Sequence, residues 1–229
     1  MEAFPLKSLT IEEATDLQFK LVDSITHYFS GDEILTRGDL GVVKELNQPR
    51  MTNKVEKVLA DFFNAEAAML VRGSGTNAIR LALHEVVGTG KTILVHDAPV
   101  YPTTQVSIDM LGIHLVYADF NDFNSVTEVL QENKVDGILI QVTRQKIDDS
   151  YDLKKLISHI RSMNKKIPIV TDDNYSALKT EGIGSQFGAT LACFSTFKLL
   201  GPEGIGCIVG ARGAIKRLKQ ENYSEIGRA

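Results

Sequence analysis

The chain of 229 residues is 43% hydrophobic and 24% charged, a composition typical of globular proteins that excludes wholesale disorder, collagen-like repeats and a disulfide scaffold. Its 25 basic and 29 acidic residues give a formal net charge of −4 without any block of like charge, so we expect neither nucleic-acid nor membrane binding. No targeting signal or membrane-length apolar run occurs, and Cys193 and Cys207 lack metal-ligand spacing, so we expect a cytoplasmic protein whose cysteines pack in adjacent strands without pairing or binding metal.

The N-terminal part of the chain begins with a predicted helix and continues as an irregular arm. Thr10 and Glu13 form a capping box, which predicts a helix that runs to about residue 29. Residues 30–53 carry Gly, Pro and Asn without periodicity and predict an extended arm, whereas apolar residues recur at helical spacing over residues 54–63. We therefore divide the chain into a helix and arm, residues 1–53, and a larger domain, residues 54–229.

Beyond residue 66, short apolar runs alternate with segments of helical spacing. The predicted strands are residues 67–71, 92–96, 114–117, 137–141, 167–171, 191–194 and 205–209, and the predicted helices are residues 78–87, 104–111, 123–133 and 153–163. This alternation is typical of a parallel sheet covered by helices on both faces. Residues 195–204 are too few for a helical crossover, so we expect one antiparallel strand. The predicted fold class is α/β, a three-layer α/β/α sandwich with a mostly parallel seven-stranded sheet.

Glycines and hydroxyl groups follow the first strand, at the predicted start of a helix. In the run Gly73-Ser74-Gly75-Thr76-Asn77, converging backbone N–H groups, a hydroxyl donor and a helix N-terminus would together bind a phosphate. A plain strand–helix turn with a capping hydroxyl would give the same pattern. No Gly-Lys-Ser/Thr follows, so this is not a Walker A loop.

Two further candidate residues follow later strands. Asp172 comes after the strand at residues 167–171, which places its carboxylate at the edge of the sheet where ligands bind; a capping aspartate is the alternative interpretation. Lys198 follows two hydroxyl residues and precedes a glycine-rich turn into the last strand. A lysine amine can form a Schiff base with a carbonyl group, although the usual interpretation of a single loop lysine is an exposed surface residue. The joint presence of a phosphate cradle, an acid and this lysine favours a functional site.

These motifs resemble those of the fold type I enzymes that use pyridoxal 5′-phosphate, the aspartate-aminotransferase superfamily. The similarity covers about residues 45–210 and is greatest to class V aminotransferases, with echoes of cysteine/methionine-metabolism lyases and selenocysteine-synthase-like proteins. The interval between Asp172 and Lys198 is the one usual in class V members. The run from Phe194 to Gly206, FSTFKLLGPEGIG, matches their Ser-x-x-Lys and Gly-Pro-x-Gly-x-Gly signature.

The resemblance implies roles for three residues in chemistry at the cofactor ring. Lys198 would form the Schiff base with the cofactor aldehyde and then move a proton on the substrate carbon. Asp172, rather than the adjacent Asp173, would pair with the pyridinium nitrogen and keep the ring an electron sink. Tyr175 would donate to the phenolic oxygen of the ring.

The resemblance also implies how the cofactor is held. Ser74, Gly75 and Thr76 would bind its phosphate, with help from Ser195 and Thr196. Tyr101 lies where the lyase relatives carry an aromatic residue stacked on the ring, and an ordinary loop tyrosine is the alternative.

Several weaker assignments follow from the same resemblance. Residues 47–52 resemble an arm that reaches into a neighbouring subunit, so Arg50 would touch phosphate or substrate across a homodimer, unless it is a surface arginine. Gln141 and Arg144 fall near the expected site without an assigned role. His96 could line the site, but we favour a satisfied core histidine.

The sequence therefore predicts a pyridoxal-phosphate-dependent enzyme that acts on an amino acid or related amine, and we favour an aminotransferase. The alternatives are a lyase, by β- or γ-elimination, ammonia loss or selenocysteine-synthase-like chemistry, and a truncated cofactor-binding domain with little activity. An unrelated Rossmann-like nucleotide-binding protein is disfavoured because no G-x-G-x-x-G motif is present. Relatives usually continue into a small C-terminal domain, which we expect to be absent or truncated here.

Overall fold

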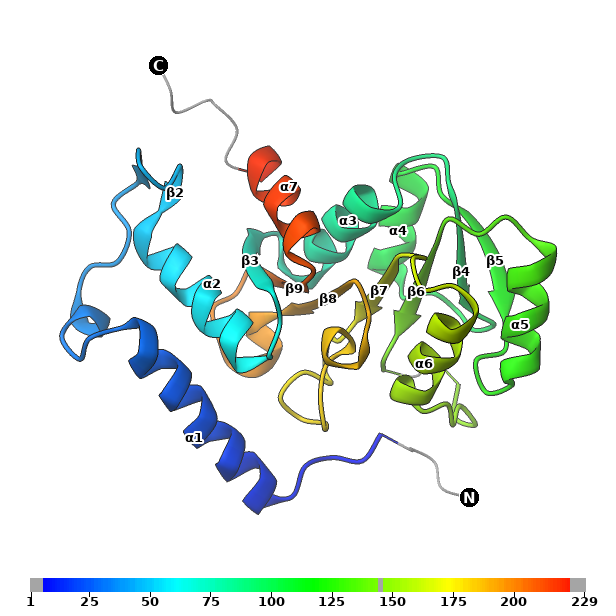
Figure 1. Cartoon of the computed structure of the whole chain (residues 1–229), viewed down its shortest axis with the longest axis horizontal. Coiled ribbons are helices and arrows are strands. Elements are labelled where there is room, and N and C mark those ends of the chain that lie inside the picture. The colour runs from blue at the N-terminus through cyan, green and yellow to red at the C-terminus, as the bar shows by residue number, and fades with distance from the viewer. Residues whose placement is uncertain (1–5, 144–145, 223–229) are drawn as a thin grey trace.

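The computed structural model describes residues 6–143 and 146–222, and its centre is a seven-stranded sheet (Figure 1). In order across the sheet, the strands are β3 (Ala67–Arg72), β9 (Ile205–Gly210), β8 (Leu191–Ser195), β7 (Ile169–Asp172), β6 (Gly137–Gln141), β4 (Thr92–His96) and β5 (His114–Ala118). Strands β8, β7, β6, β4 and β5 pair in parallel, whereas β9 runs antiparallel to both of its neighbours. The predicted fold class, including its one antiparallel strand, is confirmed.

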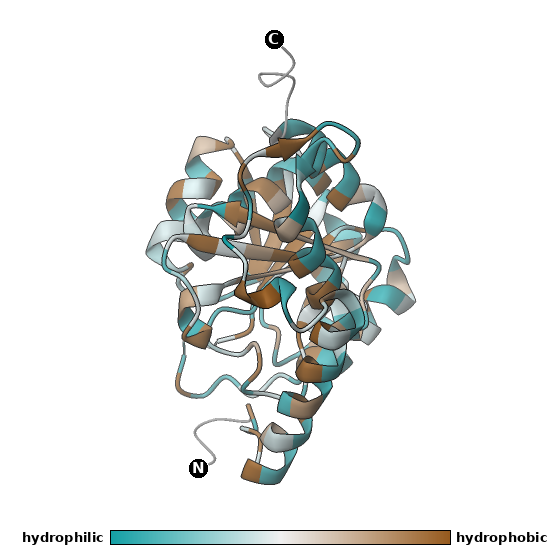
Figure 2. Cartoon of the chain, turned by 90° about the vertical axis from the view of Figure 1, so that its left-hand side faces the viewer, coloured by the Kyte–Doolittle hydropathy of each residue, from teal (hydrophilic) through white to brown (hydrophobic). Residues whose placement is uncertain are grey.

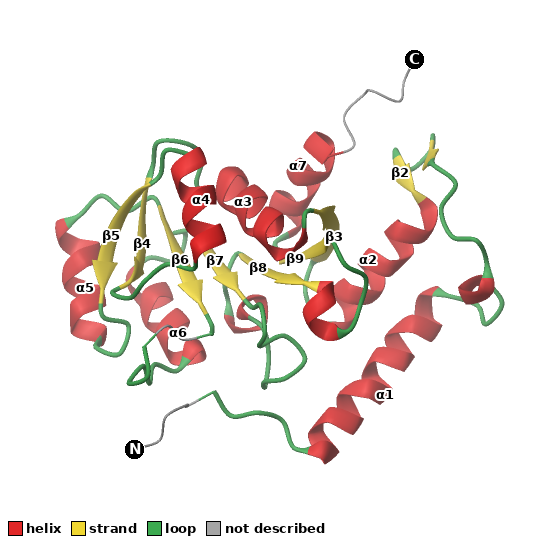
Figure 3. Ribbon diagram, turned by 180° about the vertical axis from the view of Figure 1, so that it is seen from behind, coloured by secondary structure: helices red, strands yellow, loops and turns green. Residues whose placement is uncertain are grey.

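Helices cover both faces of the sheet, and each strand contributes side chains to both sides. Helices α3 (Ser74–Val86), α4 (Pro102–Met110) and α7 (Arg212–Asn222) lie over one face; α2 (Arg50–Phe62), α5 (Phe123–Glu132) and α6 (Leu153–Met163) lie over the other (Figures 1 and 3). In β8, Leu191 and Cys193 pack on the α3 side, while Ala192 and Phe194 pack on the α2 side. This two-sided burial explains the near-continuous apolar runs, and Figure 2 shows hydrophobic residues gathered in the central strands.

The N-terminal helix has the predicted start. Helix α1 (Ile11–Tyr28) opens with the capping box, in which the Thr10 hydroxyl accepts from the Glu13 N–H and the Glu13 carboxylate accepts from the Thr10 N–H. Its Leu17 and Leu21 pack beside the cluster that contains Phe62. The division of the chain into an arm and a larger domain stays a prediction.

The arm contains more structure than its sequence predicts. It holds a short 3₁₀-helix, η1 (Glu33–Leu35), and an antiparallel pair, β1 (Val42–Val43) and β2 (Gln48–Pro49). Helix α2 begins at Arg50, so the prediction that residues 50–53 belong to the irregular arm is wrong. The reason is a distant cap: the Asp39 carboxylate accepts from the N–H groups of Met51, at 2.6 Å, and Thr52, at 2.8 Å.

Helix α7 is a second element that the sequence analysis does not predict. It buries Ala214, Ile215 and Leu218 against the sheet. Its Lys219 forms an ion pair with Glu56 of α2, which is 2% exposed and also accepts from the Leu70 N–H at 2.9 Å. Burial raises the pKa of Glu56, and the nearby ammonium group opposes that effect.

The two cysteines lie in adjacent strands, as predicted. Cys193 of β8 and Cys207 of β9 are buried free thiols that belong to apolar clusters on opposite faces of the sheet. Burial raises the pKa of both thiols. Within residues 6–143 and 146–222, no three His, Cys, Asp or Glu side chains gather into a metal-binding group. No helix in this described part has the length and apolar character needed to cross a membrane.

Candidate active site

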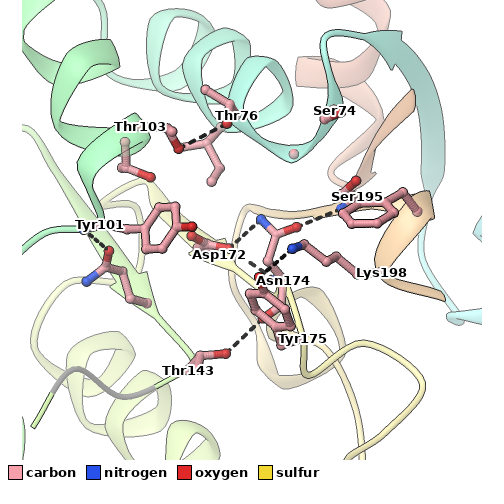
Figure 4. Close-up of a pocket in the computed structure, with 15 residues that line it drawn as sticks. Ser74, Thr76, Tyr101, Thr103, Thr143, Asp172, Asn174, Tyr175, Ser195 and Lys198 are labelled. Carbon is pink, nitrogen blue, oxygen red and sulfur yellow. Dashed lines mark hydrogen bonds between the residues drawn. The ribbon is translucent and has the colours of Figure 1, made fainter. Parts of the chain in front are cut away.

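The ends of three neighbouring strands meet at a cavity of about 220 Å³ at the carboxyl edge of the sheet (Figure 4). Gln141 ends β6, Asp172 ends β7 and Ser195 ends β8, and the first turn of α3 lies across from them. The cavity is lined by Ser74, Gly75, Thr76, Ile79, Tyr101, Thr103, Thr104, Gln141, Thr143, Asp172, Asn174, Tyr175, Ser195, Phe197 and Lys198. The residues to which we assigned the ring and the phosphate within one chain, except Thr196, therefore all line this cavity.

Lys198 reaches the cavity from the 3₁₀-helix that follows β8, η3 (Thr196–Leu199). Its side chain is half-buried, and its Nζ donates a hydrogen bond to the Tyr175 hydroxyl. The same Nζ lies 4.0 Å from the ring centroid of Tyr175 and 4.6 Å from that of Phe197. These aromatic faces stabilise a cation and hold the amine beside the cavity.

The two adjacent aspartates of the motif point in different directions. Asp172 lines the cavity, where its Oδ1 accepts from the backbone N–H and the side-chain amide of Asn174, at 3.0 and 2.8 Å. Asp173 is fully buried away from the cavity and accepts from the Thr171 hydroxyl at 2.6 Å and the Gly184 N–H at 3.0 Å. Burial raises the pKa of Asp172, and burial also raises the pKa of Asp173 to about 7. The hydrogen bonds from Asn174 oppose the effect of burial on Asp172, and a cation in the cavity would add to that opposition and favour the ionised carboxylate.

The phosphate-cradle motif forms the turn into α3 and its first turn. Gly73 takes a left-handed conformation, with φ of 92°, and Ser74 follows with φ of 59°. The N–H groups of Gly75 and Thr76 lie in the first helical turn, where N–H groups lack partners within the helix. The helix begins at Ser74 rather than at residue 78, because tertiary packing overrides the low helix propensity of Ser, Gly, Thr and Asn.

The hydroxyls of Ser195 and Thr196 differ in their surroundings. The Ser195 Oγ is buried at the cavity wall and has no hydrogen-bond partner among the residues that the structure describes. The Thr196 hydroxyl instead donates to the carbonyl groups of Pro202, at 2.8 Å, and Ile205, at 3.0 Å, and Thr196 does not line the cavity. The Thr196 hydroxyl is thus engaged by the glycine-rich turn, and its help in binding the phosphate stays a prediction that this geometry does not favour.

Tyr101 lies at the cavity mouth and is held there by Gln141. The Tyr101 backbone N–H donates to the Gln141 Oε1 at 2.7 Å, while the ring lines the cavity and is 44% exposed. The Gln141 amide also donates to the Pro99 carbonyl at 3.4 Å. Gln141, which had no assigned role, therefore positions the Tyr101 loop.

The weaker candidates lie elsewhere. His96 is a satisfied core histidine, as favoured: the Phe120 N–H donates to its Nδ1 at 3.0 Å, which leaves its Nε2 to donate to Asp149 at 2.7 Å. Arg50 is exposed at the start of α2 and does not line the cavity. Arg144 lies outside the described residues.

The sequence analysis did not single out Asn174, Thr143, Thr103 or Phe197 as lining residues. Phe197 stands inside the quoted run FSTFKLLGPEGIG, and Asn174 lies between Asp172 and Tyr175 in the sequence, so their positions were an available signal. Thr103 accepts a hydrogen bond from the Thr76 hydroxyl at 3.1 Å and depends on the contact between α3 and α4, which no local pattern reveals.

Comparison with known proteins decides the family. The model of the aminotransferase class-V family matches residues 14–225. The chain belongs to this family. Among class-V relatives, the protein YhfS of Escherichia coli (strain K12) is 50% identical over 224 residues, which cover 98% of this chain and 62% of that protein. The chain thus spans about three fifths of the length of the curated relative that it matches.

Solved structures are similar to this chain in fold. The crystal structure of YhfS from Escherichia coli, described as a pyridoxal-5′-phosphate-dependent protein, has a TM-score of 0.94 at 50% identity, with 98% of this chain and 62% of that chain covered. A carbon-sulfur lyase involved in aluminum resistance from Clostridium novyi NT has a TM-score of 0.76 at 17% identity, covering 93% of this chain and 56% of that chain. Methionine gamma lyase CalE6 from Micromonospora echinospora has a TM-score of 0.70 at 18% identity, covering 91% and 60%. The last two share the fold.

Proposed function

We propose that this class-V chain is the cofactor-binding part of a pyridoxal-phosphate-dependent enzyme that acts on an amino acid or related amine, with transamination as its reaction. The observation that carries the proposal is the cavity itself, which is lined by an amine, a buried carboxylate, a helix N-terminus and a buried hydroxyl that has no partner among the described residues. Each of these groups fits one part of the cofactor: the aldehyde, the pyridine nitrogen and the phosphate. The 50% identity to a protein described as pyridoxal-5′-phosphate dependent supports the same cofactor.

When bound, the cofactor supplies an electron sink for the bond broken at the substrate carbon. Lys198 would supply the amine that holds the aldehyde, and once the substrate amine has taken its place, the freed Nζ would carry the proton to and from the substrate carbon. Tyr175 orients that amine through its hydroxyl and its ring face. Asp172 would pair with the positively charged ring nitrogen, since a buried carboxylate is stabilised by a cation beside it.

The phosphate is proposed to lie at the start of α3. The N–H groups of Gly75 and Thr76 in the first turn would donate to the phosphate at the positive end of the helix dipole, and the Ser74 hydroxyl would add a further donor. The Ser195 hydroxyl, buried and without a partner among described residues, supplies one further donor. Tyr101 covers the ring from the cavity mouth.

A lyase is the second candidate, and Tyr101 is the observation that favours it. This tyrosine lines the cavity at the place where the lyase branch of the superfamily carries an aromatic residue over the ring. The two reactions differ in their products: transamination leaves the amino group on the protein-bound cofactor, whereas elimination releases ammonia and a keto acid. Mixing the loaded protein with candidate amino acids and assaying ammonia separates them.

We also propose a homodimer, in the cytoplasm. Support for a second copy comes from the arm, where Leu35, Leu40 and Val42 are 87%, 92% and 56% exposed. The two free cysteines are compatible with a reducing compartment. Sedimentation of the purified chain tests the dimer, and a strictly monomeric chain would contradict it.

The cofactor proposal is tested by mixing the purified chain with pyridoxal 5′-phosphate, reducing it with borohydride and mapping the labelled peptide. We expect a visible absorbance band that borohydride removes, with the label on Lys198 and no stoichiometric label in Lys198→Ala. The Nζ of Lys179 lies 6.0 Å from the Tyr175 ring centroid, but Lys179 does not line the cavity, so Lys179→Ala is a matched control that should label normally. Stoichiometric label on another lysine would overturn the assignment.

A further inference from the structure

The Asn174 side chain lies where four elements of the sheet edge converge. Asn174 follows Asp172 at the end of β7; its side chain accepts from the Ser195 N–H at the end of β8 and packs on Gly75 at the start of α3, and its backbone carbonyl accepts from Thr143 beyond the end of β6 (Figure 4). We infer that Asn174 is a positioning residue that fixes the carboxylate of Asp172 relative to the Lys198 segment. The inference rests on the proposed function, because it concerns the geometry in which the cofactor would be held.

The two ends of the Asn174 amide have different partners. Its Nδ2 donates to the Asp172 Oδ1 at 2.8 Å, and its Oδ1 accepts from the Ser195 N–H at 2.9 Å. A carboxamide donates from one end and accepts at the other, which an ionised aspartate or an apolar side chain cannot do. One side chain therefore joins the acid of β7 to the backbone that leads into Lys198.

The amide is also held in place from the other sides. The Asn174 backbone N–H donates to the same Asp172 Oδ1 at 3.0 Å, and the Asn174 backbone carbonyl accepts from the Thr143 hydroxyl at 2.8 Å. A Cβ added at Gly75 would lie 2.6 Å from both amide heteroatoms, so the helix backbone rests directly against the amide. The first turn of α3 therefore leaves no room for a side chain between itself and the amide.

This arrangement sets which oxygen of Asp172 is available. Both hydrogen bonds from Asn174 end on Oδ1, and within the described residues the other oxygen, Oδ2, receives none. Loss of the Asn174 donor would destabilise the ionised form of Asp172, and the carboxylate would no longer be held in one orientation by the side-chain amide. The titratable groups around Asp172 are Asp173 beside it, Cys193 on β8, and Tyr101, Tyr175 and Lys198 in the cavity wall.

The experiment compares Asn174→Ala and Asn174→Asp with the wild-type chain. Asn174→Ala removes both ends of the bridge, whereas Asn174→Asp keeps the acceptor for the Ser195 N–H and removes the donor to Asp172. Asn121→Ala is the matched control, because the Asn121 side chain also bridges a carboxylate, Asp149 at 3.3 Å, and a backbone N–H, that of Tyr151 at 3.1 Å, away from the cavity.

Two readouts separate the ends of the bridge. Hydrogen–deuterium exchange of the Ser195 amide is measured without cofactor, and we expect it to rise about fivefold or more in Asn174→Ala but not in Asn174→Asp or Asn121→Ala. Binding of pyridoxal 5′-phosphate is titrated by absorbance from pH 5 to 8. We expect the acid limb of the affinity profile to move upward by about one pH unit in both Asn174 variants and to stay in place in Asn121→Ala.

The two arms fail in distinguishable ways. If the wild-type chain does not bind pyridoxal 5′-phosphate, the proposed function falls, while the exchange arm still decides whether the bridge orders the Ser195 backbone. If Asn174→Ala does not fold, the pH titration of cofactor affinity can still be carried out on Asn174→Asp, which is nearly isosteric with the wild type. Unchanged exchange in a folded Asn174→Ala, or an unchanged acid limb in Asn174→Asp, would overturn the inference.

Discussion

The Nζ of Lys198 donates a hydrogen bond to the hydroxyl of Tyr175 and lies 4.0 Å from the centroid of the same ring. The two residues come from different loops, one after β8 and one after β7. Tyr175 holds its place in a left-handed conformation, with φ of 68°, which costs a non-glycine residue free energy and commonly marks a functional site. The lysine amine is thus aimed at the cavity by contacts within the chain.

Removal of the Tyr175 hydroxyl should weaken cofactor binding but keep the contact between the Lys198 Nζ and the aromatic ring of residue 175. We expect Tyr175→Phe to bind pyridoxal 5′-phosphate about fivefold more weakly, since one hydrogen bond is lost, and Tyr175→Ala to bind more weakly still, since the ring contact is lost as well. An absorbance titration measures both. Wild-type affinity in Tyr175→Phe would show that the hydroxyl does not contact the cofactor.

Replacement of Ser195 should affect stability and binding in opposite directions. Because its buried hydroxyl lacks a partner in the described part of the chain, we expect Ser195→Ala to leave the free energy of unfolding unchanged or to raise it by about 1 kcal/mol, while phosphate and pyridoxal 5′-phosphate bind about tenfold more weakly. Urea unfolding and ligand titration measure the two effects.

Ser185→Ala is the control for that experiment. The Ser185 hydroxyl is also buried without a partner among the described residues, but Ser185 does not line the cavity. It should show the same change in stability with unaltered binding. A large loss of stability in Ser195→Ala, or equal binding in the two variants, would contradict a phosphate role for Ser195.

The sequence predicts the elements whose signal is local. Strand β6 (Gly137–Gln141) and helix α6 (Leu153–Met163) have their predicted bounds because burial on both faces gives an unbroken apolar run, and a buried helical stripe gives a regular period. Asp172 and Lys198 are likewise found from their places after strands.

Features that depend on contacts between residues far apart in the chain could not be predicted from the sequence. The start of α2 is set by the Asp39 carboxylate, far from Arg50 along the chain. Ser195 and Thr196 look alike in sequence, yet successive residues at a strand end face different ways, and only Ser195 meets the cavity. The bridge made by Asn174 needs the order of the strands, which places β7 beside β8.

Gly75 should tolerate no side chain, although alanine favours helices. A Cβ there would lie 2.6 Å from the Asn174 amide, so we expect Gly75→Ala to weaken pyridoxal 5′-phosphate binding at least about tenfold through displacement of the first turn of α3. In Gly213→Ala, on α7, the added Cβ meets only the Arg217 Nη1, at 3.7 Å. That control should gain about 0.5–1 kcal/mol of stability and bind normally. Normal binding in Gly75→Ala would show that the amide can yield.

Asp173 should make the stability of the chain depend on pH. Its pKa rises from an ordinary 3.8 to about 7 because it is buried, and the charge of Asp172 adds to the effect. The folded chain therefore binds this proton more tightly than the unfolded chain. The stability that Asp173 contributes is fully present below pH 3.8 and is lost as the pH rises toward 7.

Asp173→Asn removes this titration. We expect the free energy of unfolding of the variant, relative to that of the wild type, to increase by on the order of 2 kcal/mol between pH 5 and pH 8. Thr171→Val, which deletes the hydroxyl that donates to the Asp173 Oδ2, should raise the pKa of Asp173 further and extend the fall of stability to a higher pH than in the wild type. Urea unfolding at four pH values measures all three slopes, and identical slopes in wild type and Asp173→Asn would show that Asp173 does not titrate in this range.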